Sequence, residues 1–70
     1  MNLIIGKRVK ELRKKAGLSQ EKLARKIVVD RTFISKIESG KINLTIHSLS
    51  CICKGLNVTL SEFFNTCSFW

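Results

Sequence analysis

The chain has 70 residues, 44% of them hydrophobic, and 13 Lys or Arg against five Asp or Glu give a formal net charge of +8 and an isoelectric point near 10.0. This length allows one small domain and excludes a large enzyme with a deep cleft, while the apolar content can build a core and excludes disorder. Apolar runs are far shorter than the roughly 20 residues that cross a bilayer, so we expect a soluble intracellular protein without a membrane segment.

Five short helices are predicted, and no segment has a convincing strand pattern. The first covers about residues 5–16, where apolar residues recur at the spacing of one helix face, and Gly17 ends it as a C-terminal cap. The second spans residues 20–27, and Ser19 is placed to cap its first turn. The third spans residues 31–39, between an Asp at its N-cap and a Gly at its stop.

The fourth predicted helix follows Thr45, which serves as its N-cap, and ends before Asn57, a residue that tolerates left-handed backbone. Its inward side consists of Ile46, Leu49, Ile52, Cys53 and Leu56. The segment Thr59-Leu60-Ser61-Glu62 then matches a capping box, in which the Thr hydroxyl and the Glu carboxylate each accept a hydrogen bond from a backbone N–H. This motif predicts the start of the fifth helix.

Charge is distributed unevenly along the chain. Residues 1–41 carry twelve of the 13 basic residues and four of the five acidic ones, whereas residues 42–70 carry only Lys54 and Glu62 as charged residues. The basic part is suited to a polyanion, and the neutral, apolar part is suited to core formation and self-association. We therefore expect residues 1–70 to form a single domain, in which residues 45–70 supply core and dimerisation.

Residues 20–39 have the pattern of two short helices that pack against each other, with apolar side chains at facing positions and the small Ala24 between them. Here the sequence resembles the Cro/repressor-type helix-turn-helix family over residues 4–65, through LSQEKLA, FISKIESGK and GLNVTLSEFF. Within that family, residues 30–56 look most like the controller proteins of restriction-modification systems. The resemblance implies an all-α, five-helix, lambda-repressor-like domain. It also implies a homodimer formed by the last helices, operator binding in the major groove of double-stranded DNA, and no catalysis.

The third predicted helix carries the candidate base-reading residues. Away from its apolar edge it presents donors of short reach, a surface that can contact base edges. Arginine can pair with O6 and N7 of guanine, and Thr or Phe can touch a thymine methyl group. The principal candidates are Arg31, Thr32 and Phe33, followed by Ser35 and Lys36.

Phosphate contacts are expected on both sides of that helix. Gln20 begins the second helix, where the first N–H groups are free and where family members clamp the DNA backbone. Lys41 and Asn43, just after the third helix, form the expected opposite clamp. Glu38 is interpreted as a structural ion-pair partner of Arg8 or Arg13, because DNA would repel an acidic group that faced it.

A homodimer would place two recognition helices one helical turn apart, so the expected operator is a near-palindrome with half-sites about 10 base pairs between centres. The expected interface residues are Cys51, Ile52, Phe63 and Phe64. Phe69 and Trp70 either cover this interface or pack on the same subunit.

Metal and enzyme chemistry have little support in the sequence. The three cysteines lack C-x-x-C spacing, and His47 with Cys51 offers two ligands on one helix face, which do not make a site. No nucleophile has a partnered histidine, so we expect no enzyme, no metal and no cofactor. The alternative functions are a phage-type repressor, an antitoxin-type autoregulator, or an interaction module of the same fold without DNA binding. RNA polymerase is a further candidate partner, and the expected location is the cytoplasm, on the nucleoid.

Val28 stands where the turn of this family commonly has glycine with left-handed backbone. A β-branched residue in that conformation is strained by about 1 to 3 kcal/mol. Because Ile27, Val28 and Val29 form an apolar trio, we predict that Val28 packs against the domain and adopts a negative φ.

Overall fold

The computed structural model describes residues 2–65, which form five α-helices and no strand. The helices are α1 (Asn2–Lys15), α2 (Gln20–Ile27), α3 (Arg31–Glu38), α4 (Ile46–Leu56) and α5 (Leu60–Phe63). The predicted all-α, five-helix fold is confirmed. Within this part of the chain, no helix is long and apolar enough to cross a membrane.

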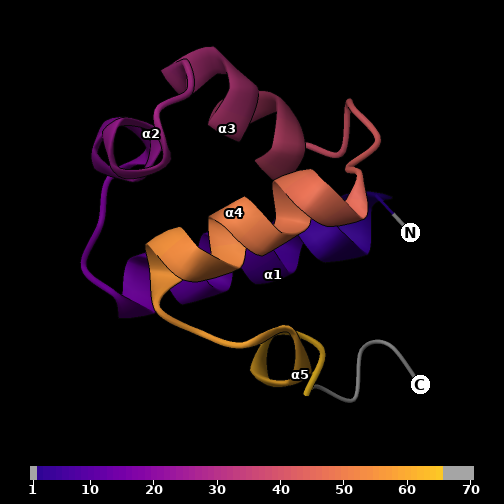
Figure 1. The fold of residues 1–70 in the computed structure, drawn as a ribbon. Coiled ribbons are helices and arrows are strands. Elements are labelled where there is room, and N and C mark those ends of the chain that lie inside the picture. Colours follow the sequence, from indigo (N-terminus) through magenta and orange to yellow (C-terminus); the bar gives the residue numbers. More distant parts are fainter. Residues whose placement is uncertain (1, 66–70) are drawn as a thin grey trace.

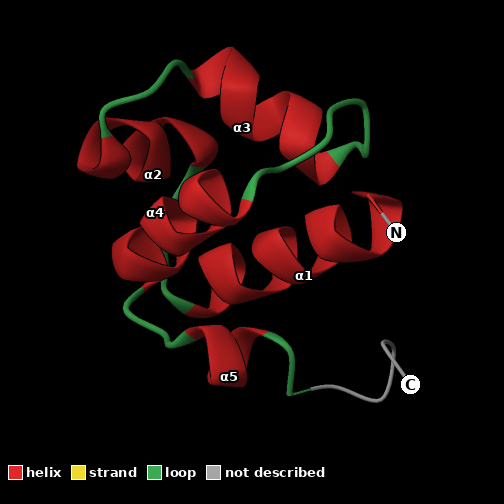
Figure 2. Cartoon of the chain, turned by 45° about the vertical axis from the view of Figure 1, so that its right-hand side comes forward, coloured by secondary structure: helices red, strands yellow, loops and turns green. Residues whose placement is uncertain are grey.

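The two long helices, α1 and α4, pack together in the middle of the molecule. In both views α2 and α3 lie at one end of the molecule and α5 lies at the other (Figure 1, Figure 2). The helix pair α2–α3 packs on both central helices, since α3 contacts α1 and α2 contacts α4. The outer side of α3 therefore lies at the edge farthest from α5.

Most predicted helix ends are confirmed in atomic detail. The hydroxyls of Ser19 and Thr45 accept hydrogen bonds from the third residue after each of them, and both bonds of the Thr59 capping box are present. Gly17 adopts a left-handed backbone with a φ of 72°, as a helix stop requires. Asp30 occupies the N-cap of α3 without a side-chain cap bond.

Ten buried apolar residues form one core to which every helix contributes. They are Val9, Leu23, Ala24, Ile34, Ile37, Leu49, Ile52, Cys53, Leu56 and Phe63. Ile46, which was predicted to face inward, is 71% exposed. It is the first residue of α4, and the buried side of this helix begins one turn later, at Leu49. Burial raises the pKa of the Cys53 thiol above its ordinary value.

Two helical glycines allow helices to approach closely. A Cβ atom at Gly6 would overlap the backbone carbonyl oxygen of Ile37 and lie 3.0 Å from that of Glu38. A Cβ atom at Gly55 would lie 2.5 Å from Cγ2 of the Ile27 side chain. Gly6 thus sets the spacing of α1 and α3, and Gly55 sets that of α4 and α2.

Candidate nucleic-acid interface

Helix α3 presents one polar, exposed side, because its other side is held in the core. Ile34, Ile37 and Glu38 are buried, whereas Arg31, Thr32, Lys36 and Ser39 are exposed. Ser35 is half-buried at the margin of the exposed side. Four of the five predicted base-reading residues, Arg31, Thr32, Ser35 and Lys36, therefore lie on or beside one surface. We name Arg31, Thr32, Ser35, Lys36 and Ser39 the outer face of α3.

Phe33 does not belong to this outer face. It is half-buried, packs against the core and lines a hollow next to α4, together with His47 and Cys51. The position of Phe33 on α3 is a quarter turn from the outer face, so its ring is directed toward α4. The expected contact of Phe33 with a thymine methyl group stays a prediction, and it would have to be made by the part of the ring that is exposed.

Gln20 lies at the first position of α2, beside the C-terminal end of α3. Its Nε2 donates a hydrogen bond to Oε1 of Glu38, at 3.1 Å. The N–H groups in the first turn of α2 have no carbonyl partner within the helix, and one of them, that of Lys22, donates to the Ser19 hydroxyl. The start of α2 thus combines backbone donors, the positive end of a helix dipole and an amide side chain, all of which suit a phosphate.

Glu38 forms a buried ion pair with Arg13, one of the two predicted partners. The Arg13 Nε lies 2.6 Å from Oε2 of Glu38, and Nη2 lies 3.1 Å from Oε1. Only 10% of the Arg13 side chain and 4% of the Glu38 side chain are exposed. Arg8, the other predicted partner, pairs with Glu11 instead and donates hydrogen bonds to the carbonyl oxygens of Glu62 and Phe63.

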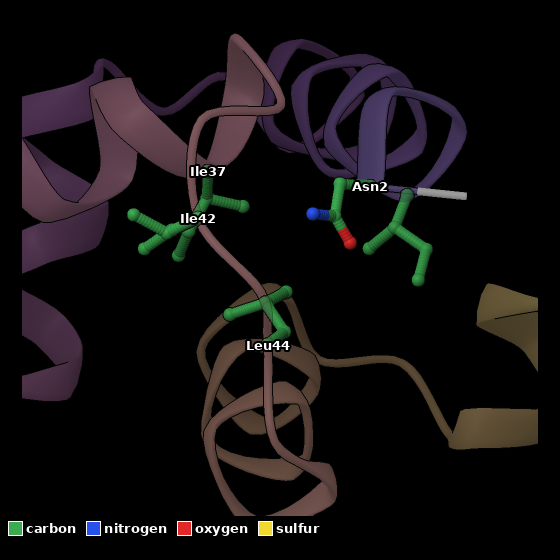
Figure 3. A pocket seen from close by; sticks show the side chains of 5 residues that line it. Asn2, Ile37, Ile42 and Leu44 are labelled. Atoms are coloured by element: carbon green, nitrogen blue, oxygen red, sulfur yellow. The ribbon is translucent and has the colours of Figure 1, made fainter.

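The segment after α3 holds Lys41 and Asn43 on the surface by burying the residues between and after them. Lys41 and Asn43 are exposed, whereas Ile42 and Leu44 are half-buried. Ile37, Ile42 and Leu44 help to line a hollow of about 130 Å³. Figure 3 shows Ile42 and Leu44 beside Ile37 there. The apolar anchors leave both polar side chains directed outward, at the end of α3 opposite to the α2–α3 turn.

Asn2 is a polar residue of this region that no sequence motif indicates. Its Nδ2 donates a hydrogen bond to Oδ1 of Asn43, at 2.6 Å. Because Oδ1 of Asn43 accepts from Asn2, the two donors of the Asn43 amide are left for other partners. No local pattern could reveal this pair, since 41 positions separate the two residues.

The predicted dimer residues divide into two groups. Ile52 and Phe63 are 0% exposed and belong to the core of the single chain, so the prediction that they form an interface is wrong. A side chain without exposed surface has none to offer to a second chain. Cys51 and Phe64 are half-buried, and the Phe64 ring meets the Phe63 ring edge-on at 5.1 Å between centroids. Phe69 and Trp70 lie outside the described residues.

The prediction for Val28 is also wrong. Its φ is 60° and its ψ is 55°, and its side chain is 88% exposed instead of packed. The Val28 N–H bonds to the carbonyl of Arg25, and the Val29 N–H bonds to that of Ala24. This pair of bonds closes the end of α2 and requires a left-handed residue at Val28, while the neighbouring Val29 packs against the core.

Replacing Val28 by glycine is expected to raise the free energy of unfolding by about 1 kcal/mol, since relief of strain exceeds the added entropy of the unfolded chain. The melting temperature should rise by about 4 to 8 °C in a domain of this size. Asn57→Gly is the matched control: Asn57 also has a left-handed backbone, with a φ of 61°, but asparagine tolerates it, so its gain should be smaller. An unchanged or lower melting temperature for Val28→Gly would show that Val28 is not strained.

Among the described residues, no group of three or more His, Cys, Asp or Glu could hold a metal ion. The predicted neighbours His47 and Cys51 do meet, with Nε2 and Sγ at 4.0 Å. The outer face of α3 offers hydrogen-bond donors and positive charge, since Arg31, Thr32, Lys36 and Ser39 are exposed on it.

Comparison with known proteins identifies the family to which this chain belongs. Residues 9–63 match the helix-turn-helix family. Control protein C.MunI of a Mycoplasma species is 49% identical over 61 residues, which cover 86% of this chain and 82% of that protein.

Solved structures agree with the match. The restriction-modification controller protein C.Esp1396I, crystallised as a tetramer with its natural 35-base-pair operator, superposes with a TM-score of 0.84 at 45% identity, over 89% of this chain and 82% of that one. The controller protein C.AhdI from Aeromonas hydrophila gives a TM-score of 0.84 at 32% identity, over 89% of this chain and 94% of that one. The chain therefore belongs to the helix-turn-helix family, and within it resembles the controller proteins of restriction-modification systems.

Proposed function

We propose that this protein is a sequence-specific DNA-binding regulator of the restriction-modification controller type, which binds a near-palindromic operator as a homodimer and catalyses no reaction. The observation that carries this proposal is the outer face of α3, which is polar, exposed and accompanied by further donors. Gln20 and the start of α2 lie beside the C-terminal end of α3, and the exposed Lys41 and Asn43 follow that end in the chain. In the proposed complex α3 enters the major groove and the flanking groups hold phosphates.

The charges of the first three helices support a nucleic acid as the partner. Glu38 is buried against Arg13, Glu11 is paired with Arg8 and Glu21 is paired with Arg25, whereas Asp30 is exposed. Exposed basic residues outnumber these carboxylates, which favours association with a polyanion. They are Lys7, Lys10, Lys14, Lys15, Lys22, Lys26, Arg31, Lys36 and Lys41.

For the dimer we propose the surface at α5, within residues 45–70. Leu60 is partly exposed and lines a shallow hollow together with Phe64, an expected interface residue. Cys51 remains a further candidate, on α4. The tetramer of C.Esp1396I on its operator supports self-association on DNA. Contact with RNA polymerase and a location on the nucleoid of the cytoplasm belong to the same proposal, since a regulator of this kind acts beside a promoter.

Selection of bound duplexes from a random DNA library, at stated salt, tests the proposal directly. We expect enrichment of a near-palindrome whose half-sites lie about 10 base pairs apart between centres. Sedimentation at micromolar concentration should give the mass of a dimer. A monomer that enriches no sequence would contradict the proposal and would favour an interaction module that has kept the fold without DNA binding.

Arg31→Ala and Lys41→Ala should separate specificity from affinity. Loss of Arg31 should cost about 1 to 3 kcal/mol on the operator and relax discrimination at one base pair of each half-site. Loss of Lys41 should weaken binding to all sequences alike and reduce the slope of affinity against salt by about one. Titrations of operator and random duplexes at several salt concentrations measure both effects. Equal losses on the two duplexes for Arg31→Ala would assign Arg31 to the phosphates.

A further inference from the structure

A buried polar network joins the start of α2 to α1 and to the end of α3. Glu38 accepts two hydrogen bonds from Arg13, and its Oε1 accepts a third from Gln20 at 3.1 Å. The remaining donor group of Arg13, Nη1, donates a hydrogen bond to the carbonyl oxygen of Leu18 at 2.8 Å. Leu18 directly precedes Ser19, the N-cap of α2. Arg13 and Glu38 thus hold both the chain that enters α2 and the first side chain of this helix.

The network determines how the Gln20 amide is oriented. A carboxylate only accepts hydrogen bonds, so the Nε2 group, and not Oε1, has to face Glu38. One hydrogen of Nε2 is used in this bond, and the second remains available to an acceptor outside the protein. Without Glu38 the half-buried amide could turn over and present Oε1, an acceptor that phosphate oxygens cannot bind.

The ion pair also removes an electrostatic obstacle. A lone carboxylate 3.1 Å from the Gln20 amide would repel a phosphate that approached this side chain. The bidentate contact of Arg13 balances that charge within the protein. The start of α2 can therefore receive an anion although an acidic residue lies directly behind it.

We propose that Arg13 and Glu38 are positioning residues for the DNA backbone contact: they fix the Gln20 amide and the first turn of α2 in the orientation that binds a phosphate. This proposal rests on the proposed DNA-binding function. It goes beyond a structural ion pair, because the Arg13 contacts already engage both oxygens of Glu38 without Gln20. The bond from Gln20 to Glu38 orients the Gln20 side chain, which in the proposed complex lies between the ion pair and the DNA.

A double-mutant cycle in two backgrounds tests the proposal. Gln20→Ala is made in the parent chain and in Arg13→Met/Glu38→Leu, where apolar residues of similar size replace the pair. The parent should lose about tenfold in operator affinity with Gln20→Ala, the effect of one hydrogen bond to a charged group. The apolar background should already show that loss, and Gln20→Ala should change its affinity less than twofold. Ala16→Ser, at an exposed, uncharged position just after α1, is the control and should leave affinity unchanged.

The salt dependence distinguishes positioning from a general loss of structure. The slope of affinity against salt should stay near the parent value in both Gln20→Ala variants, because a neutral amide displaces no counterion. Equal fold-losses for Gln20→Ala in the two backgrounds would overturn the proposal. A parent chain that binds no DNA would instead refute the proposed function.

A second background keeps the test decisive if the first does not fold. Arg13→Met/Glu38→Gln retains an oxygen that can accept from Gln20 and leaves no unpaired charge in the core. In this background the effect of Gln20→Ala should remain about tenfold, because the amide is still oriented. A loss of that effect with a folded domain would show that charge, and not orientation, connects Glu38 to the phosphate contact.

Discussion

Replacing Gly6 by alanine is expected to lower the free energy of unfolding by about 2 to 3 kcal/mol, although alanine is the better helix former. The added Cβ would overlap the backbone carbonyl oxygen of Ile37, which no rotamer change can move aside. Helices α1 and α3 would have to separate, and the core residues between them would lose contacts. Chemical denaturation of the variant and the parent measures the difference.

Two neighbouring substitutions show whether helix spacing is the cause. Lys7→Ala, on the exposed side of the same turn, should change stability by no more than about 0.5 kcal/mol. Gly55→Ala should cost less than Gly6→Ala, because the Cβ there meets the side chains of Ile27 and Leu23, which can shift. A Gly6→Ala variant as stable as the parent would mean that an added Cβ at this position does not push α1 and α3 apart.

Helix ends could be predicted because their signals are local. The hydroxyls of Ser19, Thr45 and Thr59 act on N–H groups three residues away, so sequence spacing alone places them. The exposed side of α3 followed in the same way from the 3.6-residue period. For the helix ends and the exposed side of α3, tertiary packing keeps the structure that the local sequence already favours.

The features that could not be predicted from the sequence depend mostly on packing between residues far apart in the chain. Burial of Ile52 and Phe63 in the core depends on how α4 and α5 fold back on α1, whereas sequence reasoning could only assign apolar residues to a core or an interface. The contact of Asn2 with Asn43 and the role of Gly6 likewise need both partners in space. The prediction for Val28 failed for a different reason. The two backbone hydrogen bonds that close α2 outweigh the preference of the apolar Val28 side chain for burial.

The charge of Glu38 predicted its burial against an arginine but not which arginine is its partner. Repulsion by DNA predicted that this carboxylate turns inward to an arginine, and the structure confirms a buried pair. The choice between Arg8 and Arg13 could not be made from spacing, since both lie on α1. Arg8 is engaged by Glu11 and by the end of α5, and Arg13 alone is placed to reach the end of α3.

Glu38→Leu in the otherwise native chain should destabilise the domain by about 3 to 5 kcal/mol, because it leaves the Arg13 guanidinium buried without its carboxylate. A small domain has a total stability of about 5 kcal/mol, so thermal melting should show a variant that is unfolded in large part at 37 °C. Adding Arg13→Met should restore most of that loss, since two apolar side chains in the same space need no partner charge. The coupling free energy between the two sites should therefore be at least about 2 kcal/mol in denaturation experiments. If the double variant were as unstable as Glu38→Leu alone, the loss would come from packing around Glu38 and not from an unpaired buried charge.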